Sequence, residues 1–259
     1  MHAVFGELCE KARPLLFRSL RLPSAMRVVV LAPHPDDFDA IGITLRLLRE
    51  NGNPIEVAVL TSGASGVAAD FDPQLTTAGK AAVREREQRA SCRFFGLPPD
   101  RLVFLRLAED AAGHPELSAA NLARLREYWE AHLPDLVFMP HGNDTNAGHR
   151  RAYRMVRQVA TAEERPLGLL LNRDPKTIAM RHDVYTEFDA AEAAWKGALL
   201  RLHRTQHQRN LGTRGFGFDE RILRNNRETA AAAGRGAAYA ELFELEWYAG
   251  VNAGSAGAA

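Results

Sequence analysis

The sequence has little cysteine, no excess charge of either sign and no long apolar run. Its two cysteines, Cys9 and Cys92, cannot form a disulfide framework or a paired-thiol metal site, which fits a reducing cytoplasm. A net charge of +1 gives no reason to expect nucleic acid or an anionic membrane surface as a partner. No segment approaches the roughly 20 apolar residues that a membrane-spanning helix needs. The apolar run at Leu15 is short and lies between Arg13 and Arg18, so we expect no signal peptide and a cytoplasmic protein.

The chain is long enough to bury a full hydrophobic core. It has 259 residues, of which 46% are hydrophobic, and we expect a single domain over residues 26–249. Residues 1–25 are expected to form a leader segment, an amphipathic basic helix that ends at Pro23 and packs on the domain or on a partner subunit. The small residues of 250–259 predict a flexible tail.

Strand-like apolar segments alternate with helical ones along the chain. We expect strands at residues 28–31, 55–60, 102–105 and 136–139, separated by helices at 40–50, 80–95 and 117–132. This alternation predicts an α/β fold, a Rossmann-like three-layer sandwich with a mainly parallel sheet. No Gly-x-Gly-x-x-Gly follows the first strand, so nothing indicates a dinucleotide. We expect further strands at 167–171 and 184–188, then one long helix over 189–208.

The first expected strand ends in a loop whose side chains can bind a metal or transfer protons. Each proline in Pro33-His34-Pro35-Asp36-Asp37 keeps the residue before it extended, so the loop carries polar groups to the carboxyl end of a buried strand, where ligands bind in open α/β sheets. His34 and Asp37 suit a divalent metal, and Asp36 between them can stay unligated as a base. The plainer interpretation is a turn with Asp39 as a helix cap. Three carboxylates exceed what a cap requires, however, and crowded carboxylates repel one another unless a cation is present.

A second polar loop follows the strand at 136–139 and ends at His149. Neighbouring parallel strands place their carboxyl ends side by side, so His149 can face His34 and Asp37. Two histidines and one carboxylate with an open fourth position are typical of a catalytic zinc site, and iron, cobalt or manganese would also fit. Taken alone, His149 would more often cap a helix or lie on the surface.

The stretch Ala-Pro-His-Pro-Asp-Asp at residues 32–37 resembles the signature of the PIG-L/LmbE-like family of metal-dependent N-acetylglucosaminyl deacetylases. The resemblance extends from about Arg27 to Glu244 and implies the same Rossmann-like fold. The second motif of the family ends in a metal-binding histidine at the place of His149. The family usually has Glu after the aspartate pair, where this chain has Phe38.

The second motif departs from the family pattern. The family commonly has His-x-Asp-His, and its first histidine steadies the transition state, whereas this chain has Asn146-Ala147-Gly148-His149. Asn146 can donate one neutral hydrogen bond to a developing oxyanion but cannot donate a proton. His141, which we also expect to contact substrate, or Asp144 could supply what Asn146 lacks, and the sequence leaves both open.

Other candidates for the site lie outside the two loops. Ser62 and Gly63 end the second expected strand, where small residues let a ligand approach the backbone. Arg84 lies on a charged helix that could simply be a solvated face, but it matches the arginine of the Arg-x-x-Glu pattern that the family uses for substrate binding. His203 matches a family pattern as well, and we expect it to support the site or contact substrate. With His207 it has helical i,i+4 spacing, but no carboxylate accompanies the pair to complete a second metal site.

We therefore expect a zinc-dependent N-deacetylase that hydrolyses the acetamide of an N-acetylated amino sugar. Metal coordination lowers the pKa of water from 15.7 towards about 7, and Asp36 would take the proton. Arg84 and residues 63–66 would hold the sugar or a phosphate-like substituent. The alternatives are cleavage of another amide, such as that of a thiol conjugate, phosphoester hydrolysis, for which two metals would argue, and an inactive sugar-binding protein, which Phe38 and Asn146 favour. A homo-oligomer stays open.

Overall fold

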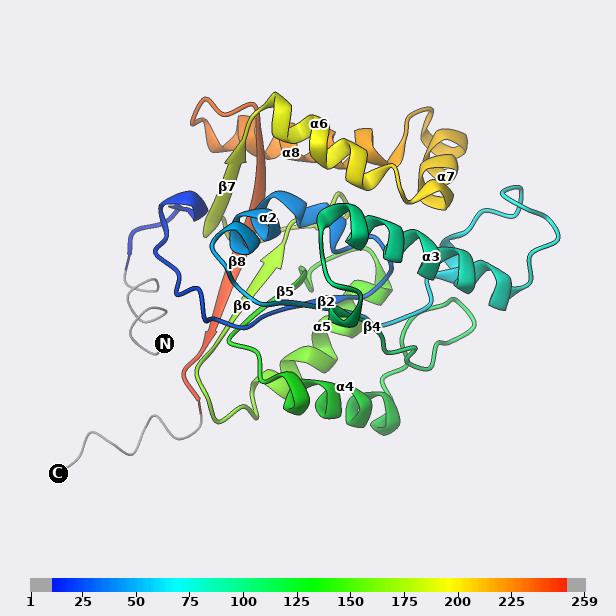
Figure 1. Cartoon of the computed structure of the whole chain (residues 1–259), viewed down its shortest axis with the longest axis horizontal. Helices are drawn as coiled ribbons and strands as arrows, with labels where there is room; N and C mark the ends of the chain where they lie inside the picture. The colour runs from blue at the N-terminus through cyan, green and yellow to red at the C-terminus, as the bar shows by residue number, and fades with distance from the viewer. Residues whose placement is uncertain (1–10, 251–259) are drawn as a thin grey trace.

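An eight-stranded sheet runs through the described part of the chain, residues 11–250 of the computed structural model (Figure 1). Its strands lie in the order β1-β7-β8-β6-β5-β2-β3-β4. The bounds are β1 Leu15–Leu16, β2 Val28–Ala32, β3 Ile55–Val59, β4 Leu102–Phe104, β5 Leu136–Pro140, β6 Leu167–Asn172, β7 Val184–Phe188 and β8 Tyr239–Tyr248. Neighbouring strands are parallel except at β8, which is antiparallel to both β6 and β7. The predicted α/β class with a mainly parallel sheet is confirmed.

Helices cover both faces of the sheet. They are α2 Gly42–Glu50, α3 Thr77–Phe95, α4 Ala119–His132, α5 Ala147–Ala160, α6 Ala190–Leu200, α7 Arg204–Arg214 and α8 Phe218–Ala233. In Figure 1, α4 and α5 lie on one face, whereas α2, α3 and the group of α6, α7 and α8 lie on the other. Within residues 11–250 no helix combines the length and apolarity that crossing a bilayer requires.

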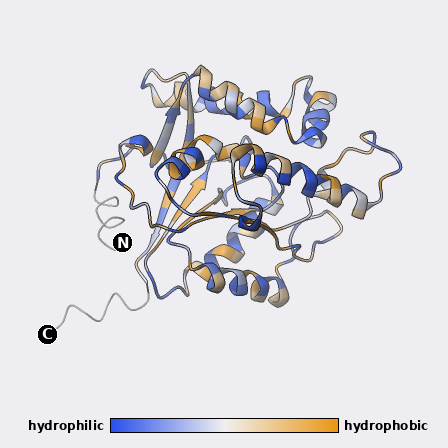
Figure 2. Cartoon of the chain, viewed as in Figure 1, coloured by the Kyte–Doolittle hydropathy of each residue, from blue (hydrophilic) through white to orange (hydrophobic). Residues whose placement is uncertain are grey.

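The inner strand β2 is buried on both faces, which is why its sequence is a continuous apolar run. Val28 and Val30 pack in the core cluster beneath α2 and α3, and Val29 and Leu31 pack in the cluster that α4 and α5 cover. Figure 2 shows the hydrophobic residues along the inner strands and the hydrophilic ones on the outer helix surfaces. The period-two alternation of a strand thus divides one apolar run between two cores.

The strand order places a crevice at the carboxyl end of β2. From β2 the chain continues to β3, which pairs with one edge of β2, and then to β4 beyond it. It then returns to β5, which pairs with the opposite edge of β2. The loops that leave β2 and β5 therefore diverge to opposite faces. Ligands of open α/β sheets bind at such a point where the strand order reverses.

The leader helix predicted for residues 1–25 is wrong for residues 11–25. Leu15 and Leu16 instead form an edge strand that pairs in parallel with β7, and a 3-10 turn follows at Phe17–Ser19. The side chains of Leu15 and Phe17 are buried in the main core, so an extended segment gains sheet hydrogen bonds and apolar burial together. Residues 1–10 of the leader and 251–259 of the predicted tail lie outside the described residues.

The single helix predicted over 189–208 is also wrong, because the helix ends at Leu200 and a second helix, α7, begins at Arg204. His203 is the residue before α7, with φ −84° and ψ 69°, and its side chain is fully buried. It turns inward to Asp39, whereas His207 pairs with Asp219 at 3.2 Å. The two histidines therefore face different partners and do not share one helix face.

Candidate metal and substrate site

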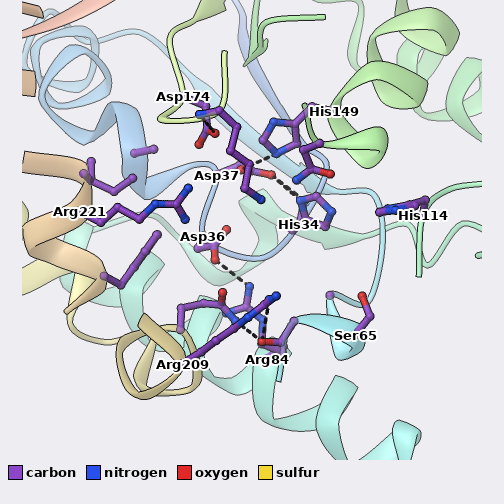
Figure 3. Close-up of a pocket in the computed structure, with 18 of the residues that line it drawn as sticks. His34, Asp36, Asp37, Ser65, Arg84, His114, His149, Asp174, Arg209 and Arg221 are labelled. Atoms are coloured by element: carbon purple, nitrogen blue, oxygen red, sulfur yellow. Dashed lines mark hydrogen bonds and ion pairs between the residues drawn. The ribbon is translucent and has the colours of Figure 1, made fainter. Parts of the chain in front are cut away.

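A cavity of about 250 Å³ lies at the carboxyl ends of β2 and β5 (Figure 3). The loops after β2, β3, β4, β5 and β6 line it, together with α3, α7 and α8. His34, Asp36 and Asp37 come from the loop after β2, and Asn146 and His149 come from the loop after β5 and the start of α5. The two predicted site loops therefore meet, although more than 100 residues separate them in the sequence.

His34, Asp37 and His149 form a group of potential metal ligands. The Asp37 carboxylate lies between the two imidazoles, with Oδ2 at 3.3 Å from His34 Nδ1 and Oδ1 at 3.4 Å from His149 Nε2. The backbone N–H of His34 also donates to Asp37 Oδ2 at 2.8 Å, which fixes the carboxylate. Ligands at about 2.0–2.1 Å from a tetrahedral ion lie roughly 3.3–3.4 Å apart. The donor types and their spacing therefore fit a single divalent metal.

The electrostatics of the group call for a positive charge beside Asp37. Burial raises the pKa of the Asp37 carboxyl, but the charge of His149 and hydrogen bonds from His149 and His34 outweigh it and hold the pKa well below its usual range. Burial lowers the pKa of His149, but the Asp37 charge and hydrogen bonds to Asp144 and Asp37 raise it to about 10. A metal must displace that proton, so metal affinity falls as the pH drops below about 10.

Asp144 orients His149 from behind. Its carboxylate is fully buried, with Oδ2 at 3.1 Å from His149 Nδ1 and Oδ1 accepting the backbone N–H of Asn146 at 2.6 Å. A metal-binding histidine commonly donates its second N–H to such a carboxylate, which fixes the ring and its tautomer. Asp144, His149 and Asp174 also form a second group of donor atoms within 4.8 Å of one another. Because the His149 Nδ1–H donates to Asp144, Nε2 is the ring nitrogen that faces Asp37, which favours the first group.

Replacing Asp144 with asparagine is expected to weaken metal affinity by about 10- to 100-fold, because the His149 ring loses its charged acceptor. Competition with a chromophoric chelator measures the affinity. Asp135→Asn is the matched control, since Asp135 is also buried and lies at the other end of β5, paired with Arg27. Equal metal affinity of Asp144→Asn and the wild type would show that Asp144 has no part in holding the ligand.

Asp36 lies beside the metal group but outside it. Its backbone has φ 114°, a left-handed conformation that is costly for a residue with a side chain. Its N–H donates to Gln88 Oε1 at 2.8 Å, and its carboxylate accepts from Arg84 Nη2 at 2.8 Å. Figure 3 shows Asp36 between Arg84 and the metal group. This geometry turns the carboxylate away from His34 and Asp37 and leaves it unligated, as a base requires.

Arg84 makes more hydrogen bonds within the protein than the sequence suggested. It is 2% exposed, and besides Asp36 it donates to the Pro35 carbonyl and to Thr205 Oγ1. Gly63, at φ 64°, allows this packing, because a Cβ there would lie 2.8 Å from the Pro35 ring and 3.3 Å from Arg84 Nε. Arg84 and Gly63 both line the cavity. In this structure Arg84 holds Asp36 in place.

Asn146 both caps α5 and faces the cavity. Its Oδ1 accepts the backbone N–H of Gly148 at 2.9 Å, which assigns the carbonyl to the cap. The amide Nδ2 makes no hydrogen bond to the described residues and is free to donate. Gly148 is needed here because a Cβ would lie 2.8 Å from His34 Nε2. The departures from the family motif thus leave one neutral donor in the site.

Three predicted site residues do not line the cavity. The backbone N–H of Ser62 donates to Glu109 Oε1 at 2.6 Å, and its hydroxyl accepts from the N–H of Ala64. His141 is buried, with Nε2 at 3.2 Å from Glu244 Oε2. The third, His203, lies behind the loop that carries the metal group. Their roles in binding or catalysis stay predictions, and these positions offer them no direct contact with the cavity.

His203 and Asp39 form a fully buried pair, with Nε2 at 2.7 Å from Oδ2. Gln88, whose carbonyl also holds the N–H of Asp36, donates to the same Asp39 oxygen at 3.2 Å. Asp39 is therefore no helix cap. In the first turn of α2, the backbone N–H groups of Ile43 and Thr44 instead donate to the Glu241 carboxylate of β8, at 3.1 and 2.9 Å. His203 thus supports the loop that carries Asp36 and Asp37.

Sequence reasoning missed several residues that line the cavity: His114, Asp174, Lys176, Arg209 and Arg221. His114 stands in a Gly-His-Pro turn and is half-buried. Asp174 and Lys176 follow β6, the next parallel strand beyond β5, so the strand-end rule that found the other groups could have found them. Arg209 and Arg221 lie on α7 and α8, and no local sequence motif indicated that they would reach the site.

A comparison with protein families found one matching family model. The PIG-L family model, described as GlcNAc-PI de-N-acetylase, matches residues 29–160, slightly over half of the chain. The matched range includes both loops of the metal group. A comparison with curated proteins found no match.

Solved structures share the fold over most of the chain. N,N'-diacetylchitobiose deacetylase from Pyrococcus horikoshii has a TM-score of 0.73 at 18% identity, covering 94% of this chain and 90% of its own. A zinc-inhibited form of teicoplanin deacetylase has a TM-score of 0.62 at 14% identity, covering 86% and 99%. GalB, the 4-carboxy-2-hydroxymuconate hydratase from Pseudomonas putida, has a TM-score of 0.59 at 18% identity, covering 85% and 95%. At these identities the likeness establishes the fold.

Proposed function

The chain belongs to the PIG-L family, and on that premise we propose that it is a metal-dependent deacetylase that hydrolyses the acetamide of an N-acetylated amino sugar. The observation that carries the proposal is the pairing of a metal group with an unligated carboxylate on one cavity wall. His34, Asp37 and His149 supply the ligands, and Asp36 lies beside them without joining them. Two imidazoles, one carboxylate and a separate base are the parts that metal-assisted amide hydrolysis requires.

The chain's own residues account for the proton transfers. A divalent metal in this group would lower the pKa of a bound water towards about 7 and polarise the acetamide carbonyl. Asp36, held by Arg84 at 2.8 Å, accepts the proton of the attacking water. Asn146 donates through Nδ2 to the oxygen on which negative charge develops. Asp36 then returns its proton to the departing amine, which balances the reaction without a second acid.

The substitution at Phe38 does not weaken the proposal. Its side chain is fully buried in the core and packs edge-to-face on Phe95, with ring centroids 5.0 Å apart. It therefore replaces the family's usual glutamate with apolar packing and does not line the cavity. Of the two departures that favoured an inactive sugar-binding protein, only Asn146 faces the site.

A screen for acetate release tests the proposal. The metal-free protein is reloaded in turn with zinc, iron(II), cobalt and manganese, because the donor set does not select among them and one solved structure with this fold is a zinc-inhibited form of teicoplanin deacetylase. We propose zinc as the resident metal and expect one metal to support acetate release from at least one N-acetylated sugar, with loss on chelation. Release from an amide of a thiol conjugate alone would favour that substrate class. If no N-acetylated sugar is hydrolysed with any of these metals, the proposed deacetylase function is wrong.

A further inference from the structure

Three cationic side chains converge on the cavity without a carboxylate partner. Lys176 follows β6, Arg209 lies on α7 and Arg221 lies near the start of α8, and all three line the cavity. Within residues 11–250 none of them forms an ion pair within 4.0 Å, and Arg209 Nη1 donates a hydrogen bond to the Gly66 carbonyl at 3.2 Å. Figure 3 shows Arg209 and Arg221 directed into the space in front of Asp36.

The charge of the cavity wall is unbalanced. Four lysine or arginine side chains and three aspartates line it, so among these side chains positive charge exceeds negative by one, and a bound divalent ion raises the excess to three. Arg84 is already paired with Asp36, which leaves the excess on Lys176, Arg209 and Arg221. A neutral sugar would leave this excess uncompensated inside a partly enclosed space, where an unpaired charge is costly.

The surroundings of Arg221 destabilise its charged guanidinium. Burial lowers the pKa of its guanidinium, and Arg214 and Arg209 lower it further, while the charges of Asp174 and Asp36 raise it. Neither aspartate approaches within ion-pair distance. A guanidinium that is desolvated and faces other cations is stabilised by an incoming anion, and its planar donors suit the paired oxygens of a phosphate or carboxylate.

Resting on the deacetylase function proposed above, we propose that Lys176, Arg209 and Arg221 form an anion subsite, and that the natural substrate is an N-acetylated sugar bearing a phosphate or a carboxylate. The metal group and the subsite line the same cavity of about 250 Å³, so one small molecule can reach both. The acetamide lies at the metal group, and the anionic substituent lies against the wall formed by α7, α8 and the loop after β6.

Calorimetry with deacetylated products tests the subsite independently of turnover. The probes are glucosamine, its 1- and 6-phosphates as the phosphate arm, and muramic acid as the carboxylate arm, each titrated into the metal-loaded protein. We expect at least one charged sugar to bind about tenfold or more tightly than glucosamine, since hydrogen bonds between charged groups are the strong ones. The preference should shrink at high salt.

Variants assign the preference to the named residues. Arg221→Gln, and separately the double variant Lys176→Gln/Arg209→Gln, should bring the ratio of charged to neutral affinity close to one. Arg224→Gln is the matched control, because Arg224 lies one turn further along α8, is half exposed and pairs with Glu220 outside the cavity. It should keep the wild-type ratio. Thermal unfolding checks that each variant is folded.

The outcomes separate the subsite from the deacetylase. Equal affinity for charged and neutral sugars in the wild type, or a ratio that survives both sets of substitutions, overturns the subsite even if acetate is released. A charged-sugar preference that is lost in Arg221→Gln supports the subsite even if no N-acetylated sugar releases acetate, and in that case only the proposed reaction fails. The arm that binds more tightly identifies the anion.

Discussion

Asp36→Asn is expected to lower kcat/KM for acetate release by about 10²- to 10⁴-fold while the protein keeps one metal ion per chain. Asparagine has nearly the shape of aspartate and can still accept the hydrogen bond from Arg84 at the present distance of 2.8 Å. It cannot accept a proton from the attacking water. Because Asp36 does not belong to the metal group, the loss should fall on kcat and leave the metal content unaltered.

Two controls make this result specific. Asp189→Asn changes a carboxylate that caps α6 and does not line the cavity, and asparagine caps helices as well as aspartate does, so activity and stability should match the wild type. Thermal unfolding of Asp36→Asn detects any damage from leaving the buried Arg84 without its charged partner. A folded, metal-loaded Asp36→Asn variant with wild-type turnover would remove Asp36 as the base.

His149→Ala is expected to abolish metal binding at micromolar concentrations and with it all acetate release. His149 supplies one of three ligands and shares hydrogen bonds with both Asp37 and Asp144, so the loss should exceed the 10- to 100-fold that removal of a supporting group costs. Metal analysis after gel filtration measures it. His182→Ala is the control, because His182 is exposed and bonds to Tyr185 outside the cavity. A His149→Ala protein that retains its metal would exclude His149 as a ligand.

Local patterns predicted the parts of the fold that depend on short segments. The apolar run of β2, the prolines after it and the alternation through β5 identified the parallel sheet, and the strand-end rule brought His149 towards His34. These inferences succeed because a buried parallel strand and its loop are determined by nearby residues.

What the sequence did not reveal depends on distant partners. Leu15 and Leu16 could be recognised as an edge strand only once β7 was in place. The break between α6 and α7 follows from the burial of His203 against Asp39, 164 residues away in the chain. Arg209 and Arg221 reach the cavity through the packing of α7 and α8, and the ion pair of Asp36 with Arg84 spans 48 residues. Local periodicity and short motifs contain no information about such contacts between distant segments.

The most direct test of the central claim is an anomalous difference map from crystals of the metal-reconstituted protein, recorded at the absorption edge of the bound metal. The account predicts one peak at about 2.0–2.2 Å from a nitrogen of His34, an oxygen of Asp37 and Nε2 of His149, with Asp36 outside that shell. A peak between Asp144, His149 and Asp174, or no peak in a protein that releases acetate, would contradict it.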